Sequence, residues 1–300
     1  MSRRFRAESL REILAFVEAS VARGEVVELL VPDPDRGRGR YAGELVDGAV
    51  HRPWRVWVDL AERLGLRLAT PRIVDGDVLL RFEPLDRDAV PARGEGTEAY
   101  GTESGFARVA KLEDPAFVID LREALQRANL PPAPRVLDVG VNTGDELELV
   151  YEVAPQAVVV GIDHAASALA VARARFPRAT LIEADVSDLG ALATLARFDL
   201  VLSIGTLQSA NLDDRELLRR LVQDHLADSG AIVLGIPNCR YVDGEIVYGT
   251  RMKNFSQPEL GLLVKDVAFY RKYLQQHHRQ VFVTGKHYVF VTGVSVATSA

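Results

Sequence analysis

The chain has 300 residues, of which 48% are hydrophobic and 26% charged, and its formal net charge is −6. This composition is that of an ordinary globular protein long enough for two domains, and the negative charge excludes a global basic field that would draw the whole protein to nucleic acid or to a membrane surface. A single cysteine, Cys239, excludes an intramolecular disulfide framework and a cysteine-based zinc site.

The start of the chain and its hydropathy bear on location. The opening MSRRFRAESL is basic, but no long apolar stretch follows it, so the pattern is not that of a secretory signal. No window approaches the roughly 18 uninterrupted apolar residues of a membrane-spanning helix. With one cysteine and neither signal, a reducing cytoplasm is the expected compartment.

The first 90 residues are expected to form a small α+β domain. Apolar residues at helical spacing predict a helix over 7–23, and the run EVVELLV predicts a strand over 25–31. A second helix is expected over 54–68, and two short strands within 72–85 are joined by an Asp-Gly hairpin signal. This domain resembles no known family, so acceptor recognition and dimerisation are both open as its role.

A linker separates this domain from the rest of the chain. Residues 86–105 lack apolar periodicity and contain Gly, Pro and Glu, which predicts a loop. A helix is expected from Asp114 to Asn129, where the segment LPPAP stops it. We therefore expect an N-terminal domain at 1–90, a linker and leading helix at 91–130, and a second domain at 131–300.

From Arg135 the pattern changes to a regular alternation of strands and helices. The central strands are apolar throughout, which indicates burial on both faces and a parallel sheet with right-handed crossovers. The expected strands are RVLDV, AVVVGID, ATLIEAD, DLVLSI and AIVLGIP, and the expected helices 145–153, 165–176, 187–196 and 213–227. A loop over 238–258, a helix over 259–277 and a hairpin formed by the two VFVTG runs follow.

The turn after the first of these strands, within RVLDVGVNTGDEL, is typical of a nucleotide-type site. Gly140 and Gly144 let a ligand approach the backbone, and the following helix offers free N–H groups at its N-terminus. The third glycine of the dinucleotide fingerprint G-x-G-x-x-G would fall at Thr143. Asp138 would also repel a pyrophosphate, whereas it suits a ligand with a positive charge at this point, such as the ammonium group of S-adenosylmethionine.

This stretch resembles motif I of the class I S-adenosylmethionine-dependent methyltransferases, with the pattern (D/E)-x-G-x-(G/C/N/S)-x-G. Asp138, Gly140, Asn142 and Gly144 occupy its positions, and the resemblance covers about residues 131–297. It implies an α/β fold with a Rossmann-like seven-stranded sheet, parallel except for a C-terminal antiparallel hairpin, beside the smaller N-terminal α+β domain. It also implies S-adenosylmethionine as donor and S-adenosylhomocysteine as product.

The resemblance assigns donor contacts to the ends of the next strands. Asp163 ends the second strand, where the family binds the two ribose hydroxyls, and His164 would lie at the edge of the donor. Asp185 and the backbone N–H of Val186 follow the third strand, where the family binds adenine. Ser203, in the fourth strand, would line the methyl group and the acceptor.

Residues for the methyl acceptor are less constrained, because transfer from a sulfonium requires position and orientation but no fixed triad or metal. No catalytic residue and no metal ligand is assigned. In resembling enzymes a segment like 96–112 often folds over the donor as a lid. The acceptor-side candidates come from this segment and from the loop after the fifth strand: Tyr100, Arg108, Asn238, Arg240 and Tyr241. The surface is the expected location of His277, His278 and His287.

The sequence thus predicts a methyltransferase that acts by in-line displacement on an unidentified acceptor, either a small molecule or RNA. The SIGT sequence differs from the (D/N/S)-P-P-(Y/F) motif of base and glutamine N-methyltransferases, which argues against that subgroup. The alternatives are a protein that binds S-adenosylmethionine without catalysis and, less favoured, a nicotinamide-dependent oxidoreductase. A homodimer is open, and neither a membrane nor a metal partner is expected.

Overall fold

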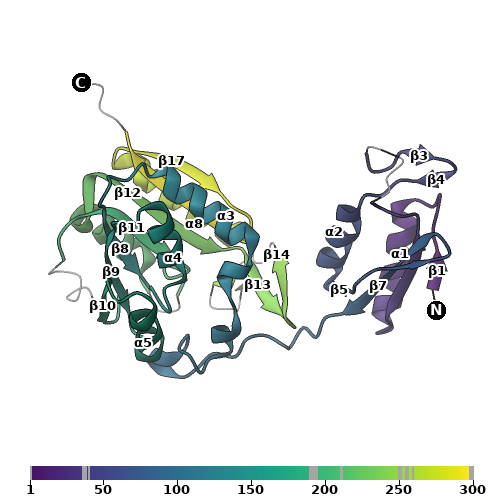
Figure 1. Cartoon of the computed structure of the whole chain (residues 1–300), viewed down its shortest axis with the longest axis horizontal. Helices are drawn as coiled ribbons and strands as arrows, with labels where there is room; N and C mark the ends of the chain where they lie inside the picture. The colour runs from purple at the N-terminus through teal and green to yellow at the C-terminus, as the bar shows by residue number, and fades with distance from the viewer. Residues whose placement is uncertain are drawn as a thin grey trace. The chain divides into compact units, whose positions relative to one another are not determined.

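The computed structural model divides the chain into two units (Figure 1). The first comprises residues 1–90 and 241–247, and the second comprises residues 91–240 and 248–300. The residues that the structure describes are 2–35, 39, 41–188, 195–209, 212–248, 252–253, 257–258 and 260–296. Within these ranges, no helix combines the length and the apolar character needed to cross a membrane.

The first unit is built on a five-stranded sheet. Its order is β1 (Ser2–Arg4), β2 (Val27–Val31), β7 (Asp77–Pro84) and β5 (Leu66–Leu68), with β6 (Arg72–Val74) also paired to β7. Helices α1 (Leu10–Ala22) and α2 (Trp54–Leu64) pack against this sheet through a core that includes Val17, Trp57 and Leu80. A short hairpin, β3 (Leu45–Val46) with β4 (Ala49–Val50), completes the unit.

The predicted helix over 54–68 is too long. Helix α2 ends at Leu64 because Gly65 adopts a left-handed conformation with φ of 66°, and the chain continues as strand β5. The predicted hairpin over 72–85 is confirmed as β6 and β7. Strands β1, β3 and β4 were not predicted, because they are too short to show a periodicity.

The second unit contains a seven-stranded sheet, as predicted. Strands β10, β9, β8, β11 and β12 pair in parallel, and β18 and β17 add an antiparallel hairpin at the edge. Their bounds are β8 (Arg135–Val139), β9 (Val158–Asp163), β10 (Thr180–Glu183), β11 (Phe198–Ile204), β12 (Leu226–Pro237), β17 (Arg279–Thr284) and β18 (Tyr288–Ser295).

Helices cover both faces of this sheet. One apolar core joins the strands to α3 (Pro115–Arg127), α4 (Asp145–Val153) and α5 (Ala166–Arg175), with Phe117 and Leu147 fully buried. The other core joins them to α7 (Asp214–Arg220) and α8 (Leu260–Gln276) through residues such as Leu217 and Tyr270. Burial on both faces explains why the strands are continuously apolar.

The carboxyl ends of the parallel strands lie together at one end of the sheet, which is called the strand-end edge below. The parallel strands β8, β9, β11 and β12 end at this edge, where Pro237 of β12 lies opposite Tyr288 of β18. Because β18 is antiparallel, it begins where its parallel neighbours end. The turn before Tyr288 therefore joins the edge that carries the candidate site.

Two predicted elements of the second half are wrong. Residues 238–258 include a hairpin, β13 (Cys239–Val242) with β14 (Glu245–Tyr248), where a loop was expected. Its turn is Asp243-Gly244, with φ of 49° and 81°, a hairpin signal. The predicted helix 213–227 ends as α7 at Arg220, followed by a π-helical turn before β12. Most of the predicted helix 187–196 lies outside the described residues.

The tip of the β13–β14 hairpin belongs to the first unit. There Arg67 of β5 forms ion pairs with Asp243 at 3.2 Å and with Glu245 at 3.1 Å. The same guanidinium also donates a hydrogen bond to the carbonyl of Asp243. These contacts hold the tip of the hairpin against strand β5.

Candidate functional site

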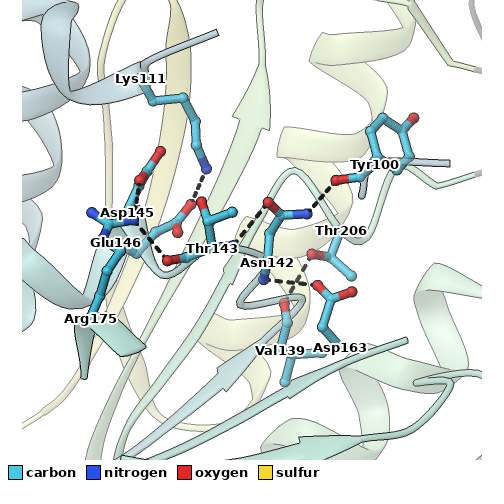
Figure 2. A network of polar contacts seen from close by, with 10 residues as sticks. All are labelled: Tyr100, Lys111, Val139, Asn142, Thr143, Asp145, Glu146, Asp163, Arg175 and Thr206. Carbon is cyan, nitrogen blue, oxygen red and sulfur yellow. Dashed lines mark hydrogen bonds and ion pairs between the residues drawn. The ribbon is translucent and has the colours of Figure 1, made fainter. Parts of the chain in front are cut away.

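The turn between β8 and α4 leaves no room for side chains at its glycines. Gly140 has a φ of 85°, and a Cβ atom placed on it would lie 1.9 Å from Oγ1 of Thr206. This hydroxyl donates a hydrogen bond of 2.9 Å to the carbonyl of Val139 (Figure 2). At Gly144, with φ of 84°, a Cβ would lie 2.7 Å from the Phe176 ring. Only glycine meets both demands at these positions.

Asp163 ties the end of β9 to this turn. Its two carboxylate oxygens accept hydrogen bonds of 2.9 Å from the backbone N–H groups of Asn142 and Ala165. The side chain of Asn142 in turn donates to the carbonyl of Tyr100 at 2.9 Å and accepts from the N–H of Thr143 at 2.9 Å (Figure 2). Asp163 is buried, and each of its oxygens keeps a lone pair for a further donor.

A buried charged cluster lies at the end of β8. Asp138 is 1% exposed, and among the described residues its Oδ2 atom has no hydrogen-bond partner. Glu146, in the first turn of α4, is equally buried and pairs with the ammonium of Lys111 (Figure 2). Burial and then the Glu146 carboxylate raise the pKa of Asp138 well above its usual value, and Lys111 opposes them.

Glu146 was not predicted as a site residue. Its signal was its place in the first turn of a helix that follows the glycine turn, where the helix dipole favours a negative charge. Lys111 was considered only as part of the lid segment. Its pKa is raised, because the charges of Glu146, Asp145 and Asp138 outweigh the desolvation that would lower it.

The remaining strand-end predictions lie at the same edge of the sheet. Asp185 follows β10, and its carboxylate accepts a 2.8 Å hydrogen bond from the N–H of Ser187. Hydrogen bonds from the side chain and then the backbone of Ser187 lower the pKa of Asp185. Val186 is buried, and His164 after β9 is half-buried. Ser203 is buried within β11, and among the described residues its hydroxyl has no partner.

The segment before α3 contacts the N-terminus of α5. The carboxylate of Glu98 accepts hydrogen bonds from the N–H and the hydroxyl of Ser167, whose oxygen accepts from the N–H of Thr102 at 2.9 Å. Tyr100 packs edge-on against Phe106, with ring centroids 5.2 Å apart. Arg108 is exposed. The segment is thus bonded to the Asn142 side chain of the glycine turn and to Ser167 of α5.

The acceptor-side candidates after β12 separate in the structure. Asn238 is buried and donates from its N–H to the carbonyl of His287 at 2.8 Å and from its Nδ2 to the carbonyl of Lys286 at 3.1 Å. Arg240 is half-buried in the second unit, whereas Tyr241 is grouped with the first unit.

His287 was expected at the surface, and this expectation is wrong. Its side chain is 13% exposed, and its Nδ1 lies 2.8 Å from the Oδ2 atom of Asp114, which is 5% exposed. The turn of the β17–β18 hairpin carries it to the strand-end edge, a position that its alternating flanks did not reveal. His277 and His278 lie at the other end of this hairpin, and the latter is exposed.

Comparisons with known proteins find methyltransferases. Residues 136–230 match the family model described as a methyltransferase domain. Trans-aconitate 2-methyltransferase of Variovorax paradoxus (strain S110) is 35% identical over 120 residues, which are 40% of this chain and 44% of the relative. The enzyme of that name from Azoarcus sp. (strain BH72) is 34% identical over 116 residues, or 39% and 44%. The matched region thus spans less than half the length of either relative.

Two solved structures are also similar. One is a precorrin-6y C5,15-methyltransferase from Geobacter metallireducens GS-15, with 17% identity and a TM-score of 0.41 over 59% of this chain and 87% of that chain. The other is a TehB-like SAM-dependent methyltransferase from Corynebacterium glutamicum, with 18% identity and a TM-score of 0.41 over 59% and 89%.

Replacing the buried carboxylate by its neutral isostere should stabilise the protein. The folded state holds a proton on Asp138 more tightly than the unfolded state does, so stability falls as pH rises from the usual pKa through the raised one. We expect Asp138→Asn to raise the free energy of unfolding at pH 7 by about 1 kcal/mol or more. The gain should vanish near pH 3, where both states carry the proton.

Denaturant unfolding of both proteins at several pH values measures this. Asp199→Asn is the matched control, because Asp199 accepts a hydrogen bond from the N–H of Arg135 at the opposite edge of the sheet, and its loss should not stabilise. An Asp138→Asn protein that is less stable than the wild type at pH 7 would show that the buried carboxylate is favourably compensated.

A methyl group at Gly140 should be destabilising beyond the strain of its backbone. Gly140→Ala adds a left-handed alanine, worth about 1–2 kcal/mol, and a collision with Thr206, worth about 1–3 kcal/mol more. Gly76→Ala is the control, because Gly76 has a similar φ of 80° and a Cβ added there would meet no atom within 4 Å. Equal losses of unfolding free energy in the two variants would refute the collision.

Proposed function

We propose that the protein is an S-adenosylmethionine-dependent methyltransferase whose second unit is a class I methyltransferase core. The observation that carries the proposal is the strand-end edge itself: a glycine turn with a buried, unpartnered Asp138 oxygen beside it, and Asp163 at the next strand. S-Adenosylmethionine, when bound, supplies an activated methyl group on a sulfonium.

The residues present fit this donor. Asp138 offers an unpartnered carboxylate oxygen to the cationic ammonium group, and the glycines at 140 and 144 allow the tight turn that brings this oxygen and Asp163 to one edge. Asp163 has lone pairs left for two ribose hydroxyls. We assign adenine contacts to Asp185, Val186 and His164, which follow β10 and β9, and a contact with the methyl group to Ser203 of β11. Asn142, held by Asp163 and Tyr100, fixes the turn under the donor.

The role that remains for the protein's own residues is to orient the donor toward the acceptor. The donor must be held with its methyl group facing the acceptor, which can contribute roughly 7–11 kcal/mol to the barrier reduction. Rigid contacts such as that between Thr206 and Val139 supply this order. The acceptor is a small molecule or RNA. The relatives' name, trans-aconitate 2-methyltransferase, makes trans-aconitate the first small molecule to assay.

Two alternatives in other classes are tested by the same ligands. A protein that binds S-adenosylmethionine without turnover would keep the donor contacts but transfer no methyl group. A nicotinamide-dependent oxidoreductase would bind a dinucleotide, which Asp138 disfavours. We further propose a cytoplasmic location, on the evidence of the single cysteine, and acceptor recognition or homodimer formation for the first unit.

Two carboxylate variants should separate the donor from a dinucleotide. Asp163→Asn weakens any ligand held by its ribose. Asp138→Asn should weaken S-adenosylhomocysteine by about 1–3 kcal/mol, the value of a charged hydrogen bond, and should leave a dinucleotide unaffected or better bound. Calorimetric titration of S-adenosylhomocysteine and NAD with each variant measures this, and Asp199→Asn again serves as control. A wild type that binds only NAD, and binds it better as Asp138→Asn, would refute the proposal.

The segment over 96–112 should act as a lid. Donor binding beside Tyr100 and Asn142 should slow proteolysis within it, because exposed loops are the preferred sites of cleavage. Glu98→Ala removes its bonds to Ser167 and should accelerate cleavage of the free protein. Glu103→Ala is the control, since Glu103 is exposed on the same segment. Cleavage that is unaffected by saturating S-adenosylhomocysteine would make the segment a plain connector.

A further inference from the structure

A histidine and an aspartate form a buried pair at the strand-end edge that no donor contact uses. His287 lies in the turn between β17 and β18, and Asp114 is the N-cap of α3. The Nδ1 and Oδ2 atoms are 2.8 Å apart, with side chains 13% and 5% exposed. Asp114 Oδ1 is occupied by the N–H of Ala116, so the carboxylate is fixed in place by the helix that it caps.

The backbone of His287 is held as firmly as its ring. The N–H of Asn238 donates to its carbonyl at 2.8 Å, and the side chain of Asn238 donates to the carbonyl of Lys286 at 3.1 Å. The N–H of Lys286 donates to Asp120 Oδ2 at 3.1 Å. The end of β12 and helix α3 thus fix the turn from two sides, which is the rigidity that an acid–base group requires.

A chain of contacts joins this pair to the glycine turn. Next to His287, the Tyr288 ring lies 5.1 Å from that of Phe117, and the ammonium of Lys111 lies 5.5 Å from the Phe117 centroid. Tyr288 also borders Gly205, where a Cβ would lie 4.0 Å from its ring, and the next residue, Thr206, covers Gly140. The pair is therefore joined to the glycine turn through Tyr288 and Thr206, at the same edge of the sheet.

The chemistry of the pair is determined by its hydrogen bond. An ionised carboxylate can only accept, so Nδ1 of a neutral His287 carries the proton and Nε2 carries the lone pair. Among the described residues, no hydrogen bond to Nε2 is formed. A histidine held in this tautomer by a carboxylate is a competent general base.

We propose that His287 is the general base of the methyl transfer, that Asp114 is its positioning residue, and that the acceptor is a hydroxyl or amine rather than a carboxylate. The acceptor's oxygen or nitrogen forms a bond to the methyl carbon as the carbon–sulfur bond breaks. Its proton passes to Nε2, and S-adenosylhomocysteine leaves as a neutral thioether. A carboxylate acceptor is already ionised at neutral pH and has no proton to give.

The charges around the pair also argue against a carboxylate acceptor. Carboxyl groups of Asp114, Asp120 and Glu146 lie around the pair and the glycine turn, and the ammonium of Lys111 is already paired with Glu146. A tricarboxylate such as trans-aconitate would meet like charge here, which opposes binding. This inference rests on the proposed function and departs from what the relatives' name would suggest for the acceptor.

The alkali stability of the product distinguishes the acceptor classes. The full-length protein is incubated with methyl-labelled S-adenosylmethionine and either trans-aconitate or a small-molecule extract of cells, and the products are then treated with mild alkali. Methyl esters release volatile labelled methanol, whereas methyl ethers and amines keep the label. We expect alkali-stable label from the extract and none transferred to trans-aconitate.

Three variants then test the pair. His287→Gln should lower transfer of alkali-stable label at least about 100-fold, the lower limit for a lost general base, while S-adenosylhomocysteine affinity stays within about twofold of the wild type. Asp114→Asn keeps a good N-cap and should lower transfer less. His278→Gln is the control, because that histidine is exposed at the far end of the hairpin, and should transfer as the wild type does.

Nitrogen-15 NMR of the histidine rings gives a readout that a purely structural role would not change. His287, assigned by its loss in His287→Gln, should be in the Nδ1–H tautomer in the wild type, and Asp114→Asn should shift it toward the Nε2–H tautomer without unfolding the protein. A wild-type ring in the Nε2–H tautomer would overturn the assignment of the base.

The remaining outcomes separate the two proposals. Alkali-labile label, or full transfer by His287→Gln, would overturn the base and the acceptor class and leave the methyltransferase proposal standing. A protein that binds S-adenosylhomocysteine but transfers label into neither trans-aconitate nor the extract would overturn both. Failure to bind S-adenosylhomocysteine would overturn the proposed function at its first step.

Discussion

Two buried carboxylates beside one ammonium group are the constraint on which the site depends. Asp138 comes from the end of β8, Glu146 from the first turn of α4, and Lys111 from the segment before α3. Desolvation disfavours each charge alone, so all three elements must meet for the cluster to persist. The unpaired Asp138 oxygen is left as a site for a further cation, at an expense in stability that packing of the two apolar cores offsets.

Much of the fold could be predicted because the strands of the second unit are buried on both faces. Continuous apolar runs such as VVVGI and LVLSI have one structural explanation, and the glycines at 140 and 144 stand where a Cβ would collide with Thr206 or Phe176. The predictions failed where a short signal competed with a longer pattern. Gly65 ended a helix inside an apolar run, and the Asp243-Gly244 turn made a hairpin within a segment that lacks a strong alternation.

The acceptor side was predicted poorly for a physical reason. The proposed donor contacts come from the ends of β8, β9, β10 and β11, which lie side by side as parallel strands, so each follows a strand that the sequence pattern already predicts. The His287–Asp114 pair joins residues that are 173 positions apart in sequence, and only antiparallel pairing of β18 with β12 brings the hairpin turn to the same edge. Neither residue lies in a motif whose spacing would predict that the two side chains are in contact. A lone histidine in a turn is usually solvated.

The most direct measurement of the central claim is the pH dependence of S-adenosylhomocysteine binding to the wild-type protein, by calorimetry in buffers of different ionisation enthalpy. The groups that face Asp138 are Glu146, Lys111 and Asp163. If the ligand's ammonium pairs with Asp138, binding releases a proton and strengthens as pH rises through the raised pKa of this carboxyl, and Asp138→Asn abolishes both effects. Binding of S-adenosylhomocysteine with the same proton release in the wild type and in Asp138→Asn would contradict the account.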